Sequence, residues 1–309
     1  MSLRTAMATA TALVLLLVSG VAVATSFPSG PWSPAIRVED IPGTSESFNT
    51  SSLDGCPFVS RDGKTFFMAS DRPGGLGGID IWMTTRASTT DPWGAPVNVG
   101  APVNSSANDF CPTIDRDGHR FFFVSNRPGG CGGDDIYVTW LRNESGFEPV
   151  GNIGCDVDGG ANSAGNEASP FPLPEAGAGP VLYFSSTRTG AGDIYRATSD
   201  GGAFGLAEAV AGLNTAAVEG QPNVRRDGLE IFFFSTRIGT LGVQDIYAAT
   251  RSSIAEVWST PVNLGAHVNS SAGETRPSLS WDGTTLYFGS TRTVGTAEGL
   301  SDIYVTSRG

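Results

Sequence analysis

The stretch SNRPGGCGGDDIY, from Ser125 to Tyr137, occurs in related form five times along this chain of 309 residues. The copy SDRPGGLGGIDIW, from Ser70 to Trp82, matches it almost residue for residue. The more distant copies are STRTGAGDIY (Ser186 to Tyr195), STRIGTLGVQDIY (Ser235 to Tyr247) and STRTVGTAEGLSDIY (Ser290 to Tyr304). Each copy begins with Ser-x-Arg and ends with Asp-Ile and an aromatic residue. A unit that recurs every fifty to sixty residues, roughly, indicates a repeat architecture.

A second pattern precedes every copy at constant spacing. An asparagine is followed by Ser or Thr, an acid comes five residues after the asparagine, and a proline comes three residues after the acid. An Asp-Gly pair begins five residues after the proline, except in the third unit, where Glu175 takes that position. The asparagines are Asn49, Asn104, Asn162, Asn214 and Asn269, and the prolines are Pro57, Pro112, Pro170, Pro222 and Pro277.

Each unit has the pattern of four short strands. The first begins near the proline, and the Asp-Gly turn leads to an apolar second strand such as HRFFFVS, residues 119–125. The variable loop leads to a third strand at Asp-Ile-Tyr, and a fourth begins at an aromatic residue such as Trp93 or Trp258. Four strands per repeat are typical of a propeller blade. The sequence therefore predicts an all-β, five-bladed β-propeller of four-stranded antiparallel blades.

The two ends of the chain predict how the propeller closes. The last unit stops after DIYVTSRG and lacks its fourth strand, whereas the segment around Trp32 (WSPAIRVED) resembles the fourth strand at Trp258 (WSTPVNLG). We expect residues from about 31 to 40 to complete the last blade, because ring closure removes exposed sheet edges.

The first residues have the pattern of an export signal. MSLR is followed by an apolar run that Gly20 interrupts and that ends in Ala22-Val23-Ala24. We expect a signal peptide over residues 1–24, a propeller over residues 25–309, and a secreted or periplasmic protein with no integral membrane segment after cleavage. The alternative is an uncleaved membrane anchor, which the short run disfavours.

The composition narrows the classes of partner. The formal net charge is −12, and Lys64 is the only lysine, so the basic surface that nucleic acid or anionic lipid requires is missing. Four cysteines in an exported protein permit two disulfides. The glycine-rich loop runs from strand to strand without the lysine and helix of a phosphate-binding loop, so we interpret it as a turn.

The combination acid-x-x-Pro, Asp-Gly, Ser-x-Arg and Asp-Ile-Tyr resembles the WD-like propeller repeat of TolB-type periplasmic proteins. The resemblance covers nearly all of the chain after the leader. It implies the propeller fold, whereas its implication for function is broad, because such propellers are binding platforms in some proteins and catalytic in others.

The repeated charges are expected to form structural clamps on one rim. The strand-1 acid, the arginine at the end of strand 2 and the strand-3 aspartate meet at one edge of each blade, so each guanidinium is expected to bridge two carboxylates. The acids are Asp54, Asp109, Glu167, Glu219 and Glu274; the arginines are Arg72, Arg127, Arg188, Arg237 and Arg292; the aspartates are Asp80, Asp135, Asp193, Asp245 and Asp302.

The same acids raise the alternative of a glycan-active enzyme, since five-bladed propellers of several glycosidase families place catalytic acids at the channel. Such an enzyme needs two carboxylates whose pKa values differ. An arginine beside every acid would instead keep all of them ionised. We therefore assign no catalytic residue.

Positions that differ between repeats are the candidates for a ligand site. The residue before the strand-1 proline is, in order, Cys56, Cys111, Ser169, Gln221 and Arg276. We expect these five residues at the channel mouth, with Gln221 and Arg276 suited to an anionic or hydroxylated ligand. The alternative is that the position varies because nothing constrains it.

The cysteines are expected to form disulfides, Cys131 with Cys155 and Cys56 with Cys111, although other pairings remain open. Zinc is disfavoured because there is no C-x-x-C motif and only His119 and His267 could assist. We expect no cofactor and no metal site. Calcium is the alternative at Asp156, Asp158 and Asn162, but Gly160 and Ala161 stand where a calcium loop needs a ligand and a glycine.

These observations predict a binding module for a protein or a cell-envelope glycan, without catalysis. The alternatives are a glycan-active hydrolase or lyase that uses channel-mouth carboxylates, and a structural subunit of a cell-envelope assembly.

Overall fold

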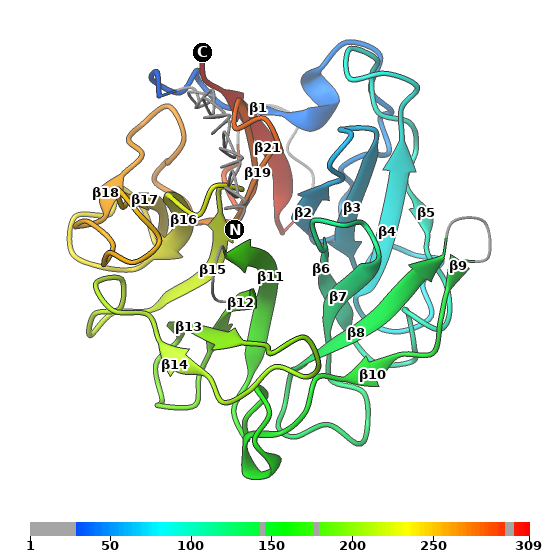
Figure 1. Ribbon diagram of the computed structural model, residues 1–309. Coiled ribbons are helices and arrows are strands. Elements are labelled where there is room, and N and C mark those ends of the chain that lie inside the picture. The colour runs from blue at the N-terminus through cyan, green and yellow to red at the C-terminus, as the bar shows by residue number, and fades with distance from the viewer. Residues whose placement is uncertain (1–28, 143–145, 176–178, 294–299) are drawn as a thin grey trace, which may run out of the picture.

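The computed structural model describes residues 29–142, 146–175, 179–293 and 300–309. The expected signal peptide lies outside the described residues. Five antiparallel sheets stand around a central axis, as Figure 1 shows, so the prediction of an all-β, five-bladed propeller is confirmed. Within the described ranges, none of the helices has the length and apolar character to span a bilayer.

Each blade runs outward from an innermost first strand, and the fourth strand is a short outer edge. Blade 1 contains β2 (Asp54–Val59), β3 (Thr65–Ser70), β4 (Asp80–Thr85) and β5 (Val97–Asn98). Blade 2 contains β6 (Asp109–Ile114), β7 (Arg120–Ser125), β8 (Asp135–Arg142) and β10 (Gly151–Asn152), with β9 (Gly146–Phe147) also paired to β8. Blade 3 contains β11 (Glu167–Glu175), β12 (Gly179–Ser186), β13 (Asp193–Thr198) and β14 (Glu208–Ala209). Blade 4 contains β15 (Glu219–Val224), β16 (Glu230–Ser235), β17 (Asp245–Thr250) and β18 (Val262–Asn263). Blade 5 contains β19 (Glu274–Leu279), β20 (Thr285–Ser290), β21 (Asp302–Ser307) and β1 (Ile36–Arg37).

Two short 3-10 helices lie in the connections, η1 (Val38–Asp40) after β1 and η2 (Asp156–Asp158) between blades 2 and 3. The second blade departs from the sequence expectation of a single fourth strand. Its third strand, β8, has 8 residues, whereas the third strands of the other blades have 6. The extra length of β8 offers hydrogen-bonding groups to β9, so the outer edge is divided between β9 and β10.

The strand connections lie on two opposite faces of the propeller, which we call the loop face and the hairpin face. The loop face carries the glycine-rich connections from strand 2 to strand 3 and the links that enter strand 1. The hairpin face carries the turns between strands 1 and 2, which contain the Asp-Gly pairs, and the connections from strand 3 to strand 4. The central channel runs between these faces, lined by the first strands, which contact their neighbours around the ring.

The hydrophobic core is divided among the seams between blades. At the seam of blades 5 and 1, Phe66 of β3 meets the edges of the aromatic rings of Phe48, Trp93 and Tyr287 at centroid distances of 5.0, 5.2 and 5.2 Å. Comparable clusters of buried aliphatic and aromatic residues fill the other seams. Burial of large aromatic side chains on both sides of a seam holds neighbouring blades together.

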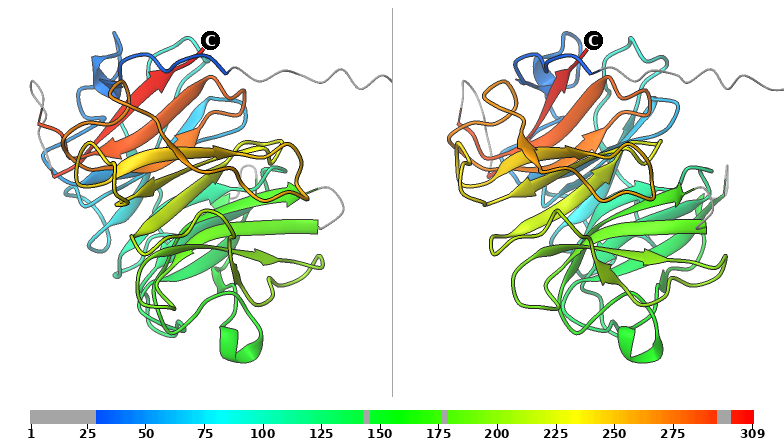
Figure 2. Two further views of the ribbon diagram at one scale, coloured as in Figure 1. Left: turned by 90° about the vertical axis from the view of Figure 1, so that its left-hand side faces the viewer. Right: turned by 60° about the vertical axis from the view of Figure 1, so that its left-hand side comes forward.

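The N-terminal segment closes the ring, as the sequence predicts. β1 pairs with β21, with Ile36 opposite Val305 and Arg37 opposite Tyr304. Figure 2 shows this blue segment lying beside the red C-terminal strand. Trp32 is buried against the ring of Phe232 in blade 4, and the guanidinium of Arg308 lies 4.6 Å from the Trp32 ring centroid. The closing segment therefore joins two blades.

Replacement of Trp32 by alanine should destabilise the propeller by about 3–5 kcal/mol, because the change leaves a cavity at the closing seam. Trp140→Ala is the matched control, since Trp140 is 52% exposed whereas Trp32 is 8% exposed. The control should change stability by about 0.5 kcal/mol or less. Denaturant unfolding followed by circular dichroism measures both changes. Equal losses in the two variants would contradict the closing role of Trp32.

Candidate functional site in the central channel

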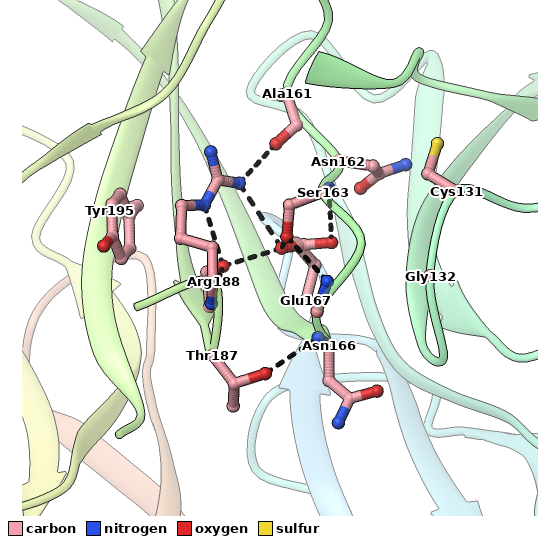
Figure 3. A network of polar contacts seen from close by, with 12 residues as sticks. Cys131, Gly132, Ala161, Asn162, Ser163, Asn166, Glu167, Thr187, Arg188 and Tyr195 are labelled. Atoms are coloured by element: carbon pink, nitrogen blue, oxygen red, sulfur yellow. Dashed lines mark hydrogen bonds and ion pairs between the residues drawn. The ribbon is translucent and has the colours of Figure 1, made fainter. Parts of the chain in front are cut away.

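Every blade buries one carboxylate at the start of its first strand. In blade 3, Glu167 accepts hydrogen bonds from the backbone N–H of Ser163 and from the hydroxyls of Ser163 and Ser186, and Arg188 Nη2 lies 3.3 Å from Glu167 Oε1 (Figure 3). The other pairs are Arg72–Asp54 at 2.5 Å, Arg127–Asp109 at 2.7 Å, Arg237–Glu219 at 3.2 Å and Arg292–Glu274 at 3.0 Å. All five carboxylate side chains are fully buried. Since a buried ion must be paired and hydrogen-bonded, these acids belong to the scaffold.

The sequence predicts that each arginine also pairs with the strand-3 aspartate of its blade, and this prediction is wrong for blades 1 to 4. The arginines do not form ion pairs with Asp80, Asp135, Asp193 and Asp245. Each guanidinium instead stacks on the aromatic residue of the strand-3 motif. The distances from Cζ to the ring centroid are 5.3 Å at Trp82, 5.1 Å at Tyr137, 4.7 Å at Tyr195, 5.0 Å at Tyr247 and 4.6 Å at Tyr304. The arginine thus joins strands 1 and 3 by one ion pair and one cation–π contact.

In blades 1, 2 and 4 the strand-3 aspartate holds the loop between strands 2 and 3. Asp135 accepts the backbone N–H groups of Cys131 at 2.7 Å and Gly132 at 3.3 Å, and burial raises the pKa of this carboxyl. A Cβ at Gly130 would lie 1.9 Å from Asp135 Oδ2, so a side chain there has no room. In blade 1, Asp80 accepts the N–H groups of Leu76 and Gly77 in the same way. The glycine loop is a turn wrapped around a carboxylate.

The repeated asparagines tie each blade to the one before it. Asn162 donates Nδ2–H to the carbonyl of Ile136 and accepts the Ile136 N–H through Oδ1. The other four asparagines make the same two contacts with Ile303, Ile81, Ile194 and Ile246. The side-chain oxygen of Asn162, a residue named in the calcium alternative, thus accepts a backbone N–H, and that alternative stays a prediction. Among the described residues, no group of three His, Cys, Asp or Glu side chains could hold a metal ion.

The five variable residues before the strand-1 prolines share an unusual backbone. The first strand of every blade contains a register shift at this point, and the residue adopts a left-handed conformation that disfavours non-glycine residues. The φ angles are 48° at Cys56, 49° at Cys111, 50° at Ser169, 56° at Gln221 and 54° at Arg276. Together these residues and the following prolines line a narrow neck of about 30 Å³ in the channel. That volume suits about one water molecule.

The neck residues also connect neighbouring first strands, differently at each seam. Cys56 and Cys111 form a disulfide between blades 1 and 2, and Ser169 Oγ lies 3.4 Å from Cys111 Sγ. The backbone N–H of Gln221 donates to Ser185 Oγ of blade 3, and its Oε1 accepts the backbone N–H of Arg276. The position varies because each seam requires a different contact. Its predicted ligand-binding role remains a prediction.

Arg276 is the exceptional member of the neck. Its Nε is buried without a hydrogen-bond partner in the described structure, and burial lowers the pKa of the guanidinium. The guanidinium extends towards the neighbouring blade 1, where a Cβ at Gly55 would lie 2.9 Å from Nη1. Unlike the five clamp arginines, Arg276 has no ion pair with a described carboxylate. This side chain lines the neck of the channel.

The second disulfide, Cys131–Cys155, joins the glycine loop of blade 2 to the link that leads into blade 3. Both expected pairings are therefore present. Two disulfides suit a protein of an oxidising compartment.

Below the neck the channel widens towards the hairpin face into a cavity of about 810 Å³, which we call the hairpin cavity. Phe58 and Phe171 line both spaces, so the two are continuous. The wall is apolar, and Arg61, Arg116, Arg226 and Trp281 stand among the lining residues. The sequence analysis missed this group. The available signal was the residue before each Asp-Gly pair, which is arginine in three units and tryptophan in the last.

The channel offers few carboxylates for hydrolytic chemistry. No described residue that lines the neck is acidic, and the hairpin cavity is lined by Asp62 and Asp115. The hydrogen bond from the Ser60 hydroxyl lowers the pKa of Asp62, and Asp115 pairs with Arg120 at 2.9 Å. Both carboxylates are already engaged by neighbouring side chains. General acid catalysis needs a carboxyl whose pKa is raised.

No family model matches the chain, and no curated protein sequence matches it. Solved structures with the same fold include an α-L-arabinofuranosidase from Lactobacillus brevis, at a TM-score of 0.56 and 11% identity, covering 88% of this chain and 94% of that one. An endo-arabinase from Bacteroides thetaiotaomicron matches at a TM-score of 0.52 and 14% identity, covering 85% and 97%. TolB from Acinetobacter baumannii matches at 0.50 and 16% identity, covering 92% and 65%. These likenesses show the propeller fold alone, and glycosidase propellers match as well as TolB.

Removal of one clamp arginine should be costly. Arg237→Met leaves the buried carboxylate of Glu219 without its counter-ion and should destabilise the protein by about 3–5 kcal/mol. The control is Arg196→Met, because the Arg196–Glu208 pair lies at the surface, where ion pairs contribute about 1 kcal/mol or less. Denaturant unfolding measures both. A loss in Arg237→Met no larger than that in the control would contradict the scaffold role.

Arg276→Met should have the opposite effect and raise the temperature of unfolding. The change replaces a buried cation that lacks a carboxylate partner by an apolar side chain of similar length. Differential scanning calorimetry of this variant beside Arg237→Met makes the comparison. An equal decrease in melting temperature for both substitutions would contradict the conclusion that the Arg276 cation is uncompensated.

Proposed function

We propose that this protein is a non-catalytic binding module that engages a partner protein through the loop face of its propeller. The observation that carries the proposal is a set of exposed apolar side chains on that face. Val218, Ile238, Leu241 and Val243 all belong to blade 4, at the entry to β15 and in the loop between β16 and β17. We call these four residues the blade-4 patch.

The blade-4 patch stands on an ordered support. Asp245 accepts the backbone N–H groups of Leu241 at 2.6 Å and Gly242 at 3.2 Å, and Asn263 Nδ2 donates to the same carboxylate at 2.6 Å. The N–H of Val243 donates to the carbonyl of Ala272 in the link that enters blade 5. A loop held in this way loses little conformational freedom on binding.

Apolar side chains favour a protein over a glycan as the partner. Val243 is 73% exposed and Ile238 is completely exposed, and exposed apolar side chains that gather on one face mark protein-interaction sites. Leu76 of blade 1 and Leu300 of blade 5 extend the same character around the face. The protein would act in a secreted or periplasmic setting, which the two disulfides suit.

A glycan hydrolase is the alternative that the fold permits. Its support is the shared propeller architecture, whereas catalysis depends on particular residues and not on the fold. The five rim acids are each held by an arginine, the cavity-lining Asp115 pairs with Arg120, and a hydrogen bond from Ser60 lowers the pKa of the cavity-lining Asp62. The arrangement of charges therefore supports binding better than hydrolysis.

A photo-cross-linking residue at Val243 should capture one defined protein in the native compartment, whereas the same residue at Val262, on the outer strand β18, should not. The captured protein, once purified, should bind the triple variant Ile238→Ser, Leu241→Ser, Val243→Ser at least about tenfold more weakly than the wild type in calorimetry.

Val262→Ser serves as the control and should bind with unchanged affinity. Unchanged binding by the triple variant would contradict the loop-face proposal. Binding of the wild type to a glycan array, together with no protein captured at Val243, would contradict it as well. Turnover of aryl glycosides or polysaccharides by the wild type would favour the hydrolase.

A further inference from the structure

Three guanidinium groups surround one indole at the rim of the hairpin cavity. The Cζ atoms of Arg61, Arg226 and Arg116 lie 4.9, 5.5 and 5.8 Å from the ring centroid of Trp281. The four residues come from blades 1, 4, 2 and 5, and each directly precedes an Asp-Gly pair. The repeat therefore places four equivalent positions around one axis. Three of these positions carry an arginine and the fourth carries a tryptophan.

The cluster has an excess of positive charge in an acidic protein. Among the described carboxylates, none forms an ion pair with Arg61 or Arg116. The two acids that line the cavity have other partners, because Asp62 accepts from Ser60 and Asp115 pairs with Arg120. Like charges held together repel each other, and the chain as a whole has a formal net charge of −12. Such a group is stabilised when an anion binds.

The space beneath the cluster is apolar. The ends of the first strands contribute Val59, Ile114, Val224 and Leu279 to its wall. Blades 1 and 2 contribute the further apolar lining residues Phe67, Met83, Leu141 and Phe147. A volume of about 810 Å³ is large enough for a small organic molecule. An apolar wall below a cationic rim is complementary to a molecule with both characters.

We propose that the hairpin cavity binds an amphiphilic anion, whose carboxylate or phosphate head lies at Arg61 and Arg116 and whose apolar body fills the cavity. Guanidinium groups bind such heads through paired N–H donors. Burial of the apolar body supplies affinity that the head alone lacks. The site lies on the face opposite the blade-4 patch, so the inference is independent of the proposed partner protein.

The test uses laurate, dodecyl phosphate and dodecanol, which share a chain length and differ in the head, together with inorganic phosphate as a head without a chain. Each compound is titrated below its critical micelle concentration, and binding is measured by tryptophan fluorescence and by calorimetry. Laurate or dodecyl phosphate should show one saturable site. Dodecanol and inorganic phosphate should bind at least about tenfold more weakly, since each lacks one of the two interactions. The stronger of the two anions identifies the preferred head.

The double variant Arg61→Gln, Arg116→Gln should weaken laurate binding by about 10–100-fold and leave dodecanol binding unchanged, because it removes charged hydrogen-bond donors. Arg196→Gln, on the third strand of blade 3 and outside the cavity lining, is the control and should bind like the wild type. Without ligand, the double variant should melt at a higher temperature than the wild type, because repulsion is relieved.

Equal affinity for laurate and dodecanol, or unchanged laurate binding by the double variant, would overturn the proposal. A lower melting temperature of the unliganded double variant would assign the arginines to the scaffold and overturn it as well. Absence of saturable binding by both anions would do the same.

Discussion

A buried guanidinium–carboxylate pair at the start of every blade is the constraint on which the rest of the structure depends. The carboxylate is fully enclosed and satisfied by an arginine, a hydroxyl and a backbone N–H, as Glu167 illustrates. The same guanidinium stacks on the strand-3 aromatic ring, so one side chain joins strands 1 and 3 across strand 2. Because loss of either partner would leave an uncompensated buried charge, the pair tolerates little change. This requirement accounts for the constancy of acid, arginine and aromatic residue in all five repeats.

The repeated scaffold leaves the two faces free to differ. On the loop face, the strand-3 aspartates hold the glycine turns in place, and the variable residues of those turns present apolar groups such as Val243 to solvent. On the hairpin face, the residues before the Asp-Gly pairs gather arginines around Trp281. The narrow neck separates these faces, and Arg276 is one of its lining residues. One propeller thus offers two chemically distinct sites, exposed apolar side chains on the loop face and an arginine cluster on the hairpin face.

The repeat spacing predicted the fold, the closing strand and the location of the five neck residues, because periodic position in a repeat translates directly into position around a ring. The repeat spacing does not predict which particular atoms contact each other. The strand-3 aspartates were expected to meet the arginines, yet Asp135 is taken by the backbone of its own glycine loop. Gln221 and Ser169 are candidate ligand contacts by their variation, and the structure adds that they join adjacent blades. Equal spacing in the sequence does not specify which of several nearby polar groups forms the hydrogen bond or ion pair with a given side chain.

The sequence by itself determined the class of fold, the number of blades and the residues that each blade repeats, since hydrophobic alternation and turn residues act locally. Only the tertiary structure decided what the non-repeated residues do, because their neighbours come from different blades. Arg61, Arg116 and Trp281 are far apart in the chain, and no local pattern shows that they surround a common cavity. Their proximity results from closing the ring, which brings equivalent positions of separate repeats to the same axis.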